Sequence, residues 1–142
     1  MSVTDPGQSE PLTEIVVPSR IEATQEPEQR ILTEVARYGY NPDAAFAIKL
    51  ALQEAVTNAI KHGNRNDPEK HLTLRFAVSP EKAVIAVADE GEGFCVEQVP
   101  DPTIDANLEC PTGRGIMLMR AYMNHVSYND TGTEVTMVKL NE

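Results

Sequence analysis

The chain has 142 residues, of which 24% are charged and 41% are hydrophobic, and its formal net charge is −10. A chain of this length buries about 70% of its unfolded surface, which favours a single domain with one core. The excess of acidic over basic residues argues against direct nucleic-acid binding, because a phosphate backbone needs clustered cations. We find no secretory signal and no run of about 18 apolar residues, so the sequence predicts a cytoplasmic protein that does not insert into membranes.

The first third of the chain predicts a tail, a strand and a helix. Residues 1–11 contain Pro, Gly and polar residues with almost no apolar side chains, which is typical of a flexible tail. Residues 12–18 alternate loosely between polar and apolar and end in proline, which predicts a short edge strand. Residues 22–38 place apolar side chains at helical spacing, so we expect an amphipathic helix with Pro27 near its first turn and its end at Gly39.

A second helix and a strand hairpin follow. Asn41 is a suitable N-cap and Pro42 suits the first helical position, so we expect this helix to begin there and to run to Gly63. Its apolar residues share one face, as in a helix that packs on a core. Residues 71–79 and 83–89 predict two strands that are joined by a tight turn.

A long connection separates this hairpin from the C-terminal elements. Residues 89–113 include three Gly and three Pro, and the stretch 86–112 holds seven acidic residues and no Lys or Arg. A loop of this length inside a compact domain is usually functional or disordered. A third helix over 116–124 then leads into two strands, 125–129 and 134–140. Helices interspersed with antiparallel hairpins predict an α+β sandwich with its helices on one face of the sheet.

The first candidate functional segment lies on the second helix. Glu54 and Asn58 are four residues apart and therefore share a helix face, at the border of the apolar arc. Their oxygen atoms could serve a hard cation such as Mg²⁺, which takes its other ligands from water and phosphates. The alternative is an ordinary polar pair on a solvated helix flank.

The second candidate segment follows the apolar strand that ends near residue 88. Asp89 lies where the strand leaves the sheet, and its carboxylate could accept a hydrogen bond from an exocyclic amine such as that of adenine. Gly91 and Gly93 permit backbone angles closed to other residues and the close approach of a flat ligand. The alternative is a glycine-rich turn without a ligand.

The third candidate segment is Gly113-Arg114-Gly115, which precedes an apolar run and should lie at a helix N-terminus. Exposed N–H groups and the positive end of the helix dipole make such a terminus suitable for an anion. Arg114 is the first cation after the acidic stretch and could pair with a phosphate. The alternative is a pair of glycines that only ends a loop.

Together, in this order and at these separations, the three segments resemble the N, G1 and G2 boxes of the GHKL, or Bergerat-fold, ATPases. Gly132-Thr133 in the last hairpin is similar to the closing G3-type element of that superfamily. The resemblance extends from about residue 12 to the C-terminus. The small size and the run EAVTNAIKHGN are most similar to the anti-sigma-factor serine/threonine kinases of bacterial partner-switching systems. Agreement of four elements is more specific than a single glycine motif and favours the functional interpretation of each.

The resemblance implies a single domain over residues 12–142 that is a two-layer α/β sandwich. Its sheet would be mixed and mostly antiparallel, with helices on one face, and Mg-ATP would bind between the helices and a lid over residues 94–112. By position in the motifs, Glu54 would be the general base and Asn58 the Mg²⁺ ligand. Asp89 would hold the adenine amino group.

The resemblance also implies roles for the residues around these three. Thr133 would support the contact between Asp89 and adenine. Gly91 and Gly93 would make room for the base and ribose. Gly113 and Gly115 would cradle phosphates beneath the lid, where Arg114 would offset their charge.

The function implied is that of an ATP-dependent serine/threonine protein kinase that acts as an anti-sigma factor. It would phosphorylate an anti-sigma-factor antagonist on Ser or Thr, sequester a sigma factor and form a homodimer. Other interpretations stay open: a non-catalytic or weakly catalytic ATP-binding partner-switch module that regulates another signalling protein, an ATP-independent scaffold, and the ATP-binding domain of a two-component sensor kinase. The last needs an acceptor histidine in a helix pair, and neither His62 nor His71 nor His125 has such surroundings in the sequence.

Overall fold

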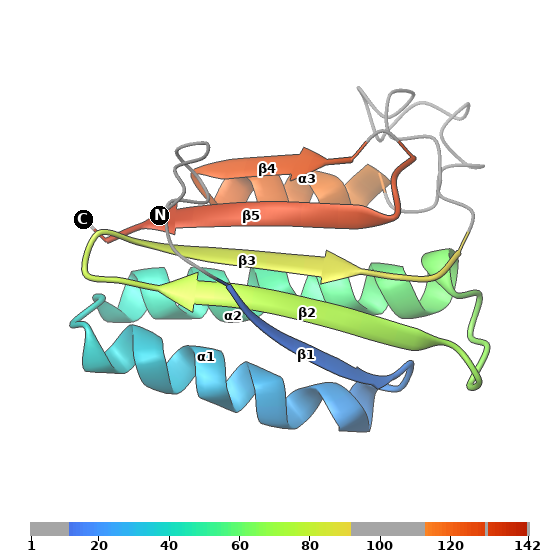
Figure 1. Ribbon diagram of the computed structural model, residues 1–142. Helices are drawn as coiled ribbons and strands as arrows, with labels where there is room; N and C mark the ends of the chain where they lie inside the picture. Colours follow the sequence, from blue (N-terminus) through green and yellow to red (C-terminus); the bar gives the residue numbers. More distant parts are fainter. Residues whose placement is uncertain (1–11, 92–112, 130, 142) are drawn as a thin grey trace.

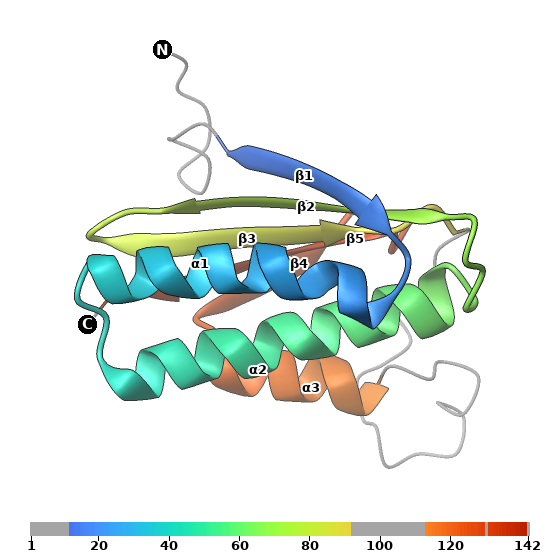
Figure 2. The same ribbon diagram turned by 90° about the horizontal axis from the view of Figure 1, so that it is seen from below.

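The computed structural model describes residues 12–91, 113–129 and 131–141, and for residues 113–117 it describes the backbone alone. A five-stranded sheet forms one layer, and the helices pack on one of its faces as the second layer (Figure 1). The view from below shows the helices side by side beneath the sheet (Figure 2). This arrangement confirms the predicted two-layer α+β fold.

The strands of the sheet pair in the order β1-β2-β3-β5-β4, and each of these pairs is antiparallel, so the described sheet is fully antiparallel and not mixed, contrary to the expectation. The last hairpin is therefore turned so that its second strand lies against the middle of the sheet. The first strand is an edge strand, as predicted. The bounds of the strands are β1 (Thr13–Pro18), β2 (His71–Val78), β3 (Lys82–Ala88), β4 (His125–Tyr128) and β5 (Glu134–Leu140).

The first helix ends, and the second begins, at the signals that the sequence contains. A short 3₁₀ turn, η2 (Ile21–Thr24), leads into α1 (Gln25–Arg37), which is followed by Gly39 in a left-handed conformation with φ of 77°. Helix α2 (Pro42–Asn58) starts with proline, and the backbone N–H of Ala44 donates to the side-chain oxygen of Asn41 at 2.7 Å. The predicted cap satisfies one of the free N–H groups of the first turn.

The end of the second helix differs from the prediction. Helix α2 does not run as a regular α-helix to Gly63 but ends at Asn58, and a π-helical turn, η3 (Ala59–Gly63), follows it. In this turn the N–H of Asn64 donates to the carbonyl of Ala59 at 2.7 Å. Such wider turns occur mostly as single insertions and frequently at functional sites. The third helix, α3 (Gly113–Tyr122), begins three residues before and ends two residues before the predicted bounds.

The core lies between the sheet and the helices. Alternate residues of β2 and β3 point toward the helices, which places large apolar side chains in one layer. Fully buried side chains from all three helices meet them there. The largest of these buried residues are Ile31, Val35, Ile48, Leu52, Leu72, Leu74, Ile85, Val87, Met119 and Met137.

The outer face of the sheet carries a chain of charged side chains. Arg75 on β2 alternates with the inward-facing Leu74 and Phe76, so it points away from the helices. Its Nε donates to Glu14 of β1 at 3.1 Å, and its Nη1 pairs with Glu134 of β5. Because β3 lies between β2 and β5, the Arg75 side chain crosses the central strand.

In the part of the chain that the structure describes, none of the helices has the length and apolar character needed to cross a membrane.

Candidate functional site

The C-terminal half of α2 carries the first two predicted site residues. Glu54 and Asn58 are both half-buried, one turn apart on the same flank of the helix. A separation of four residues corresponds to about 6 Å along the helix axis. Both side chains can therefore act on one ligand that lies along this flank.

A hollow brings Asn58 together with residues from distant parts of the chain. Its polar lining comes from Asn58 on α2, Asp89 after β3, Tyr128 on β4, and Gly132 and Thr133 before β5. Apolar side chains of α2, β3 and β5 form the rest of the wall. The hollow measures about 10 Å³, which is room for about one water molecule and far below the roughly 300 Å³ of a small-molecule pocket.

The Asp89 carboxylate is fixed by the loop that carries it. The N–H of Asp89 donates to the carbonyl of Thr133 at 2.9 Å, and the N–H of Gly91 donates to Asp89 Oδ1 at 2.8 Å. Burial raises the pKa of Asp89 above its usual range, while the Gly91 N–H and the nearby Lys70 act against this shift. A partly desolvated carboxylate of this kind is a strong acceptor for an N–H donor.

Two glycines allow the loop to lie directly on the end of α2. A Cβ atom at Gly63 would be 2.1 Å from Asp89 Oδ2, and a Cβ atom at Gly91 would be 1.8 Å from the carbonyl oxygen of Gly63. Glycine is thus required at both positions by the contact between η3 and the loop. The sequence singled out Gly91 as space for a ligand, whereas the structure uses that space for the protein's own backbone.

Thr133 lies in a hydrogen-bonded turn beside Asp89. Its N–H donates to Asn129 Oδ1 at 2.9 Å, and its hydroxyl accepts from Asn129 Nδ2 at 3.0 Å. The Thr131 hydroxyl oxygen is 2.9 Å from the Thr133 hydroxyl oxygen. Gly132 has a φ of 77°, which lets this tight turn close. The predicted neighbours Asp89 and Thr133 therefore meet, joined by a backbone hydrogen bond.

The Asn58 amide lies in the wall of the hollow, beside the Tyr128 hydroxyl. Its Nδ2 is buried and makes no hydrogen bond to the described residues, although the Tyr128 hydroxyl lies close enough to interact with it. Buried amides without partners are rare. Rotation of the Asn58 side-chain amide by 180° would put its oxygen where Nδ2 now lies. An oxygen ligand suits Mg²⁺. The residues present are thus compatible with a divalent cation that depends on Asn58.

Tyr128 is a site residue that the sequence analysis missed. It faces the hollow because it pairs with the inward-facing Val135 of β5. Burial raises the pKa of its hydroxyl, so the hydroxyl is a neutral donor at pH 7. The alternation of exposed and half-buried residues along β4 could have placed it on the inner face, but the neighbours of that face depend on the strand order.

Several predicted site residues lie outside what the structure describes. They are Gly93, the predicted lid over residues 94–112 and the side chain of Arg114, since only the backbone of 113–117 is described. The predicted N-terminal tail, residues 1–11, also lies outside the described residues. The backbone does show that α3 starts at Gly113. Within the described residues, no group of three or more His, Cys, Asp or Glu has the arrangement of a metal site.

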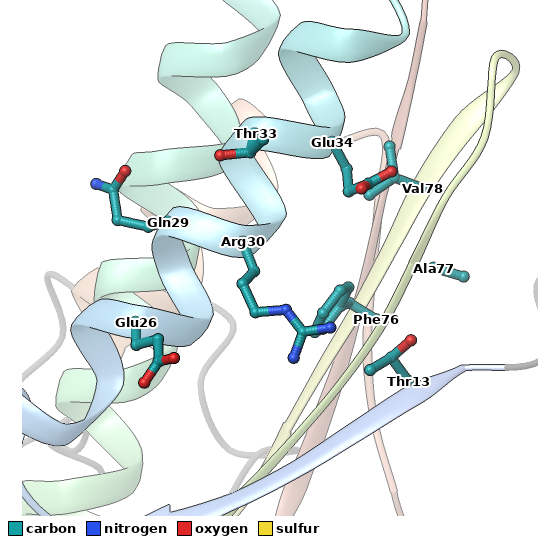
Figure 3. Close-up of a pocket in the computed structure, with 9 residues that line it drawn as sticks. All are labelled: Thr13, Glu26, Gln29, Arg30, Thr33, Glu34, Phe76, Ala77 and Val78. Carbon is teal, nitrogen blue, oxygen red and sulfur yellow. The ribbon is translucent and has the colours of Figure 1, made fainter.

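A larger groove lies away from these residues. It measures about 560 Å³ and runs between α1 and the adjoining edge of the sheet, where Figure 3 shows its lining. The Arg30 guanidinium lies over the Phe76 ring, 5.6 Å from its centroid. None of the residues predicted from the motifs lines this groove, so its size alone does not make it the functional site.

The comparisons with known proteins agree with the geometry. The sequence profile of the family described as "Histidine kinase-like ATPase domain" matches residues 17–139. The chain belongs to this family. Membership of an ATPase-domain family implies ATP binding, and it confirms the resemblance to the GHKL ATPases.

Relatives within this family are named serine-protein kinase RsbW. The protein of Bacillus subtilis (strain 168) is 34% identical over 113 residues, which cover 73% of this chain and 69% of the relative. That of Listeria monocytogenes serovar 1/2a is 30% identical over 111 residues, which cover 73% of this chain and 71% of the relative.

A solved structure shares the fold. It is a crystal structure of the RsbU and RsbW domains of a Mycobacterium tuberculosis protein, with a TM-score of 0.61 and 18% sequence identity. The match covers 94% of this chain and 34% of the other, so this chain spans about a third of that protein.

Proposed function

We propose that the protein is a cytoplasmic, Mg-ATP-dependent serine/threonine protein kinase that acts as an anti-sigma factor. It phosphorylates an anti-sigma-factor antagonist and sequesters a sigma factor when the antagonist is not bound. The main support is that Asn58, Asp89 and Thr133, which come from three distant segments, line one hollow in a chain of the ATPase family.

Each proposed role follows from the chemistry of the side chain. Bound Mg-ATP supplies the phosphoryl group that is transferred. The Asp89 carboxylate accepts a hydrogen bond from the adenine amino group, and Thr133 supports that contact through its turn. The Asn58 oxygen holds the metal. Glu54, one turn earlier on the same flank of α2, accepts the proton of the attacking hydroxyl.

The remaining roles belong to segments whose side chains the structure does not describe. We propose that Gly93 makes room beside the base, that Gly113 and Gly115 cradle the phosphates, and that Arg114 offsets their charge. Residues 94–112 would close over the nucleotide and exclude water. The backbone N–H groups at the start of α3 have no partner within the helix and lie at the positive end of the helix dipole, so they suit an anion.

The charge of the molecule fits a partner switch. Phosphorylation adds about −1.5 to −2 charges to the antagonist. The kinase has a formal net charge of −10, so the product is repelled and leaves. The kinase would act as a homodimer, for which the edge strand β1 offers a strand edge.

Phosphotransfer by Glu54 variants tests the proposed reaction. Labelled ATP is incubated with Mg²⁺, the antagonist and either wild-type protein or Glu54→Ala. Loss of the general base should lower transfer by about 10²- to 10⁴-fold and leave ATP binding intact. Gln53→Ala, an exposed neighbour on the same helix, should transfer normally.

Two results would argue against this reaction. Unchanged transfer by Glu54→Ala removes Glu54 from the role of base. Tight ATP binding by the wild-type protein without transfer to any antagonist points instead to a non-catalytic ATP-binding switch module.

A further inference from the structure

Asn64 is a fully buried polar residue that the proposed reaction does not use. Its relative exposure is 0%, and it follows the π-helical turn at the end of α2. Its Nδ2 donates to Ser19 Oγ at 3.0 Å and to the carbonyl of His71 at 3.1 Å. Its Oδ1 accepts from the N–H of Glu90 at 2.8 Å. One amide thus ties together the end of β1, the end of α2, the start of β2 and the loop after β3.

The Glu90 bond matters because Glu90 directly follows Asp89. Three successive N–H groups of this loop have partners: Asp89 donates to Thr133, Glu90 to Asn64, and Gly91 to the Asp89 carboxylate. The loop is therefore fixed at each residue around the carboxylate. The three acceptors are the Thr133 carbonyl, the Asn64 side chain and the Asp89 side chain. Of these, Asn64 lies at the end of α2.

A second contact ties Glu90 of the same loop to the start of β2. The Glu90 side chain accepts from the N–H of His71 at 2.9 Å, and His71 is also the residue whose carbonyl accepts from Asn64. Glu90 is thus clamped between Asn64 and the start of β2. Beside this clamp, Gly63 and Gly91 leave no room for a side chain, so a shift of the loop would move the Asp89 carboxylate with it.

We infer that Asn64 is a positioning residue, which through the Glu90 N–H sets the place of the Asp89 carboxylate and with it the selectivity for a purine that carries a 6-amino group. This inference rests on the proposed function, because it takes Asp89 as the acceptor for adenine. Asn64 itself touches no substrate atom. It acts by holding the loop.

The test compares two nucleotides that differ at the C6–N1 edge of the purine, since inosine triphosphate also carries a proton on N1. ATP carries the 6-amino group, and inosine triphosphate has an oxygen in its place. Dissociation constants for both are measured by calorimetry with Mg²⁺. Wild-type protein should bind ATP about tenfold more tightly or better, because the carboxylate accepts from the amino group but repels the oxygen. In Asn64→Ala the ratio of the dissociation constant for inosine triphosphate to that for ATP should fall at least about fivefold, toward equal binding.

Two matched variants separate positioning from stability. Ser19→Ala removes another partner of the same amide but leaves the Glu90 bond, so its ratio should stay within about twofold of wild type. Asn64→Asp retains an oxygen for the Glu90 N–H and should also preserve the ratio. Its second oxygen replaces the donor to the His71 carbonyl, so the ratio is compared only after urea unfolding has shown that this variant is folded.

An unchanged ratio in folded Asn64→Ala would overturn the inference. Asn64→Leu, which fills a similar volume, replaces that variant if Asn64→Ala does not fold, and failure of both to fold makes Asn64 a purely structural residue. Wild-type protein that binds neither nucleotide contradicts the proposed function instead. Equal binding of both nucleotides by wild type contradicts the role of Asp89.

Discussion

At the scale of single residues, Asp89, the proposed acceptor for adenine, shows how burial of a carboxyl group can reduce folding stability. Burial raises its pKa in the folded protein above the value of an exposed carboxyl. The folded state therefore binds the proton more tightly than the unfolded state does. Proton binding by Asp89 thus stabilises the fold. This contribution is fully present below the pKa of the unfolded state and is lost as the pH rises through the pKa of the folded state. At neutral pH the ionised carboxylate destabilises the fold.

Asp89→Asn should accordingly stabilise the protein at pH 7. The amide keeps an oxygen for the Gly91 N–H but carries no charge that burial opposes. Urea unfolding at a series of pH values should show an advantage in unfolding free energy over wild type at pH 7, which shrinks as the pH falls through the raised pKa of Asp89 and is gone below the unfolded value of about 4. The exposed Glu69→Gln serves as control and should show little change. Lower stability of Asp89→Asn at pH 7 would contradict this account.

Gly63→Ala should lower ATP affinity, whereas Gly39→Ala should lower folding stability without changing ATP affinity. A Cβ at Gly63 collides with the Asp89 carboxylate, so ATP affinity should fall by about tenfold. Gly39 has open space around it but a φ of 77°, so alanine there should cost about 1–2 kcal/mol of folding stability and leave ATP affinity unchanged. Calorimetry and urea unfolding of both variants check the pair. Equal ATP affinity in the two would be the contrary result.

Individual site residues were predictable where a local motif marks them and not where the fold assembles them. Glu54, Asn58 and Asp89 stand in short motifs. Asn64 was missed because its partners are distant: Ser19 is 45 residues away and Glu90 is 26 residues away. A polar residue in a glycine-containing turn reads as exposed in sequence. Only the packing of four segments buries it.

At the scale of elements, helix α2 illustrates the same division. Its start was predictable because the Asn41 cap and Pro42 act locally. Its end was not, because the π-helical turn, η3, is accompanied by tertiary contacts of Gly63 and Asn64 with the loop after β3. The apolar periodicity continues through this turn, so it gives no sign of the change.

Asn41→Ala should weaken α2 without altering the site. Removal of the hydrogen bond to the Ala44 N–H should cost about 1 kcal/mol of folding free energy. ATP affinity should stay within about twofold of wild type, because the cap lies at the far end of the helix from Asn58. Asn41→Ser should restore most of the stability. Urea unfolding that shows no loss in Asn41→Ala would mean that this cap is dispensable.

The sheet was predictable as hairpins and not as an order of strands. The turns after β2 and β4 join strands that are neighbours in sequence, which short-range signals reveal. The pairing of β3 with β5 joins segments separated by α3 and the long connection. This pairing brings Asp89 beside Thr133, so the site depends on a feature of the sheet that local patterns do not contain.

At the scale of the whole molecule, the two layers bring the motifs to one end of the sheet. Asn58 belongs to the helix layer, and Asp89 and Thr133 follow and precede strands of the sheet layer. The likeness to a solved structure that contains an RsbW domain supports the two-layer fold itself. We propose that these side chains together bind one metal-bound adenine nucleotide.

Calorimetric titration of ATP in the presence of Mg²⁺ tests this claim most directly. Wild-type protein should bind ATP saturably, whereas Asn58→Ala and Asp89→Asn should each abolish measurable binding while remaining folded. Gln53→Ala, on the exposed face of α2, should bind as wild type does. If both Asn58→Ala and Asp89→Asn bind ATP as tightly as the wild-type protein, these residues do not form the nucleotide site.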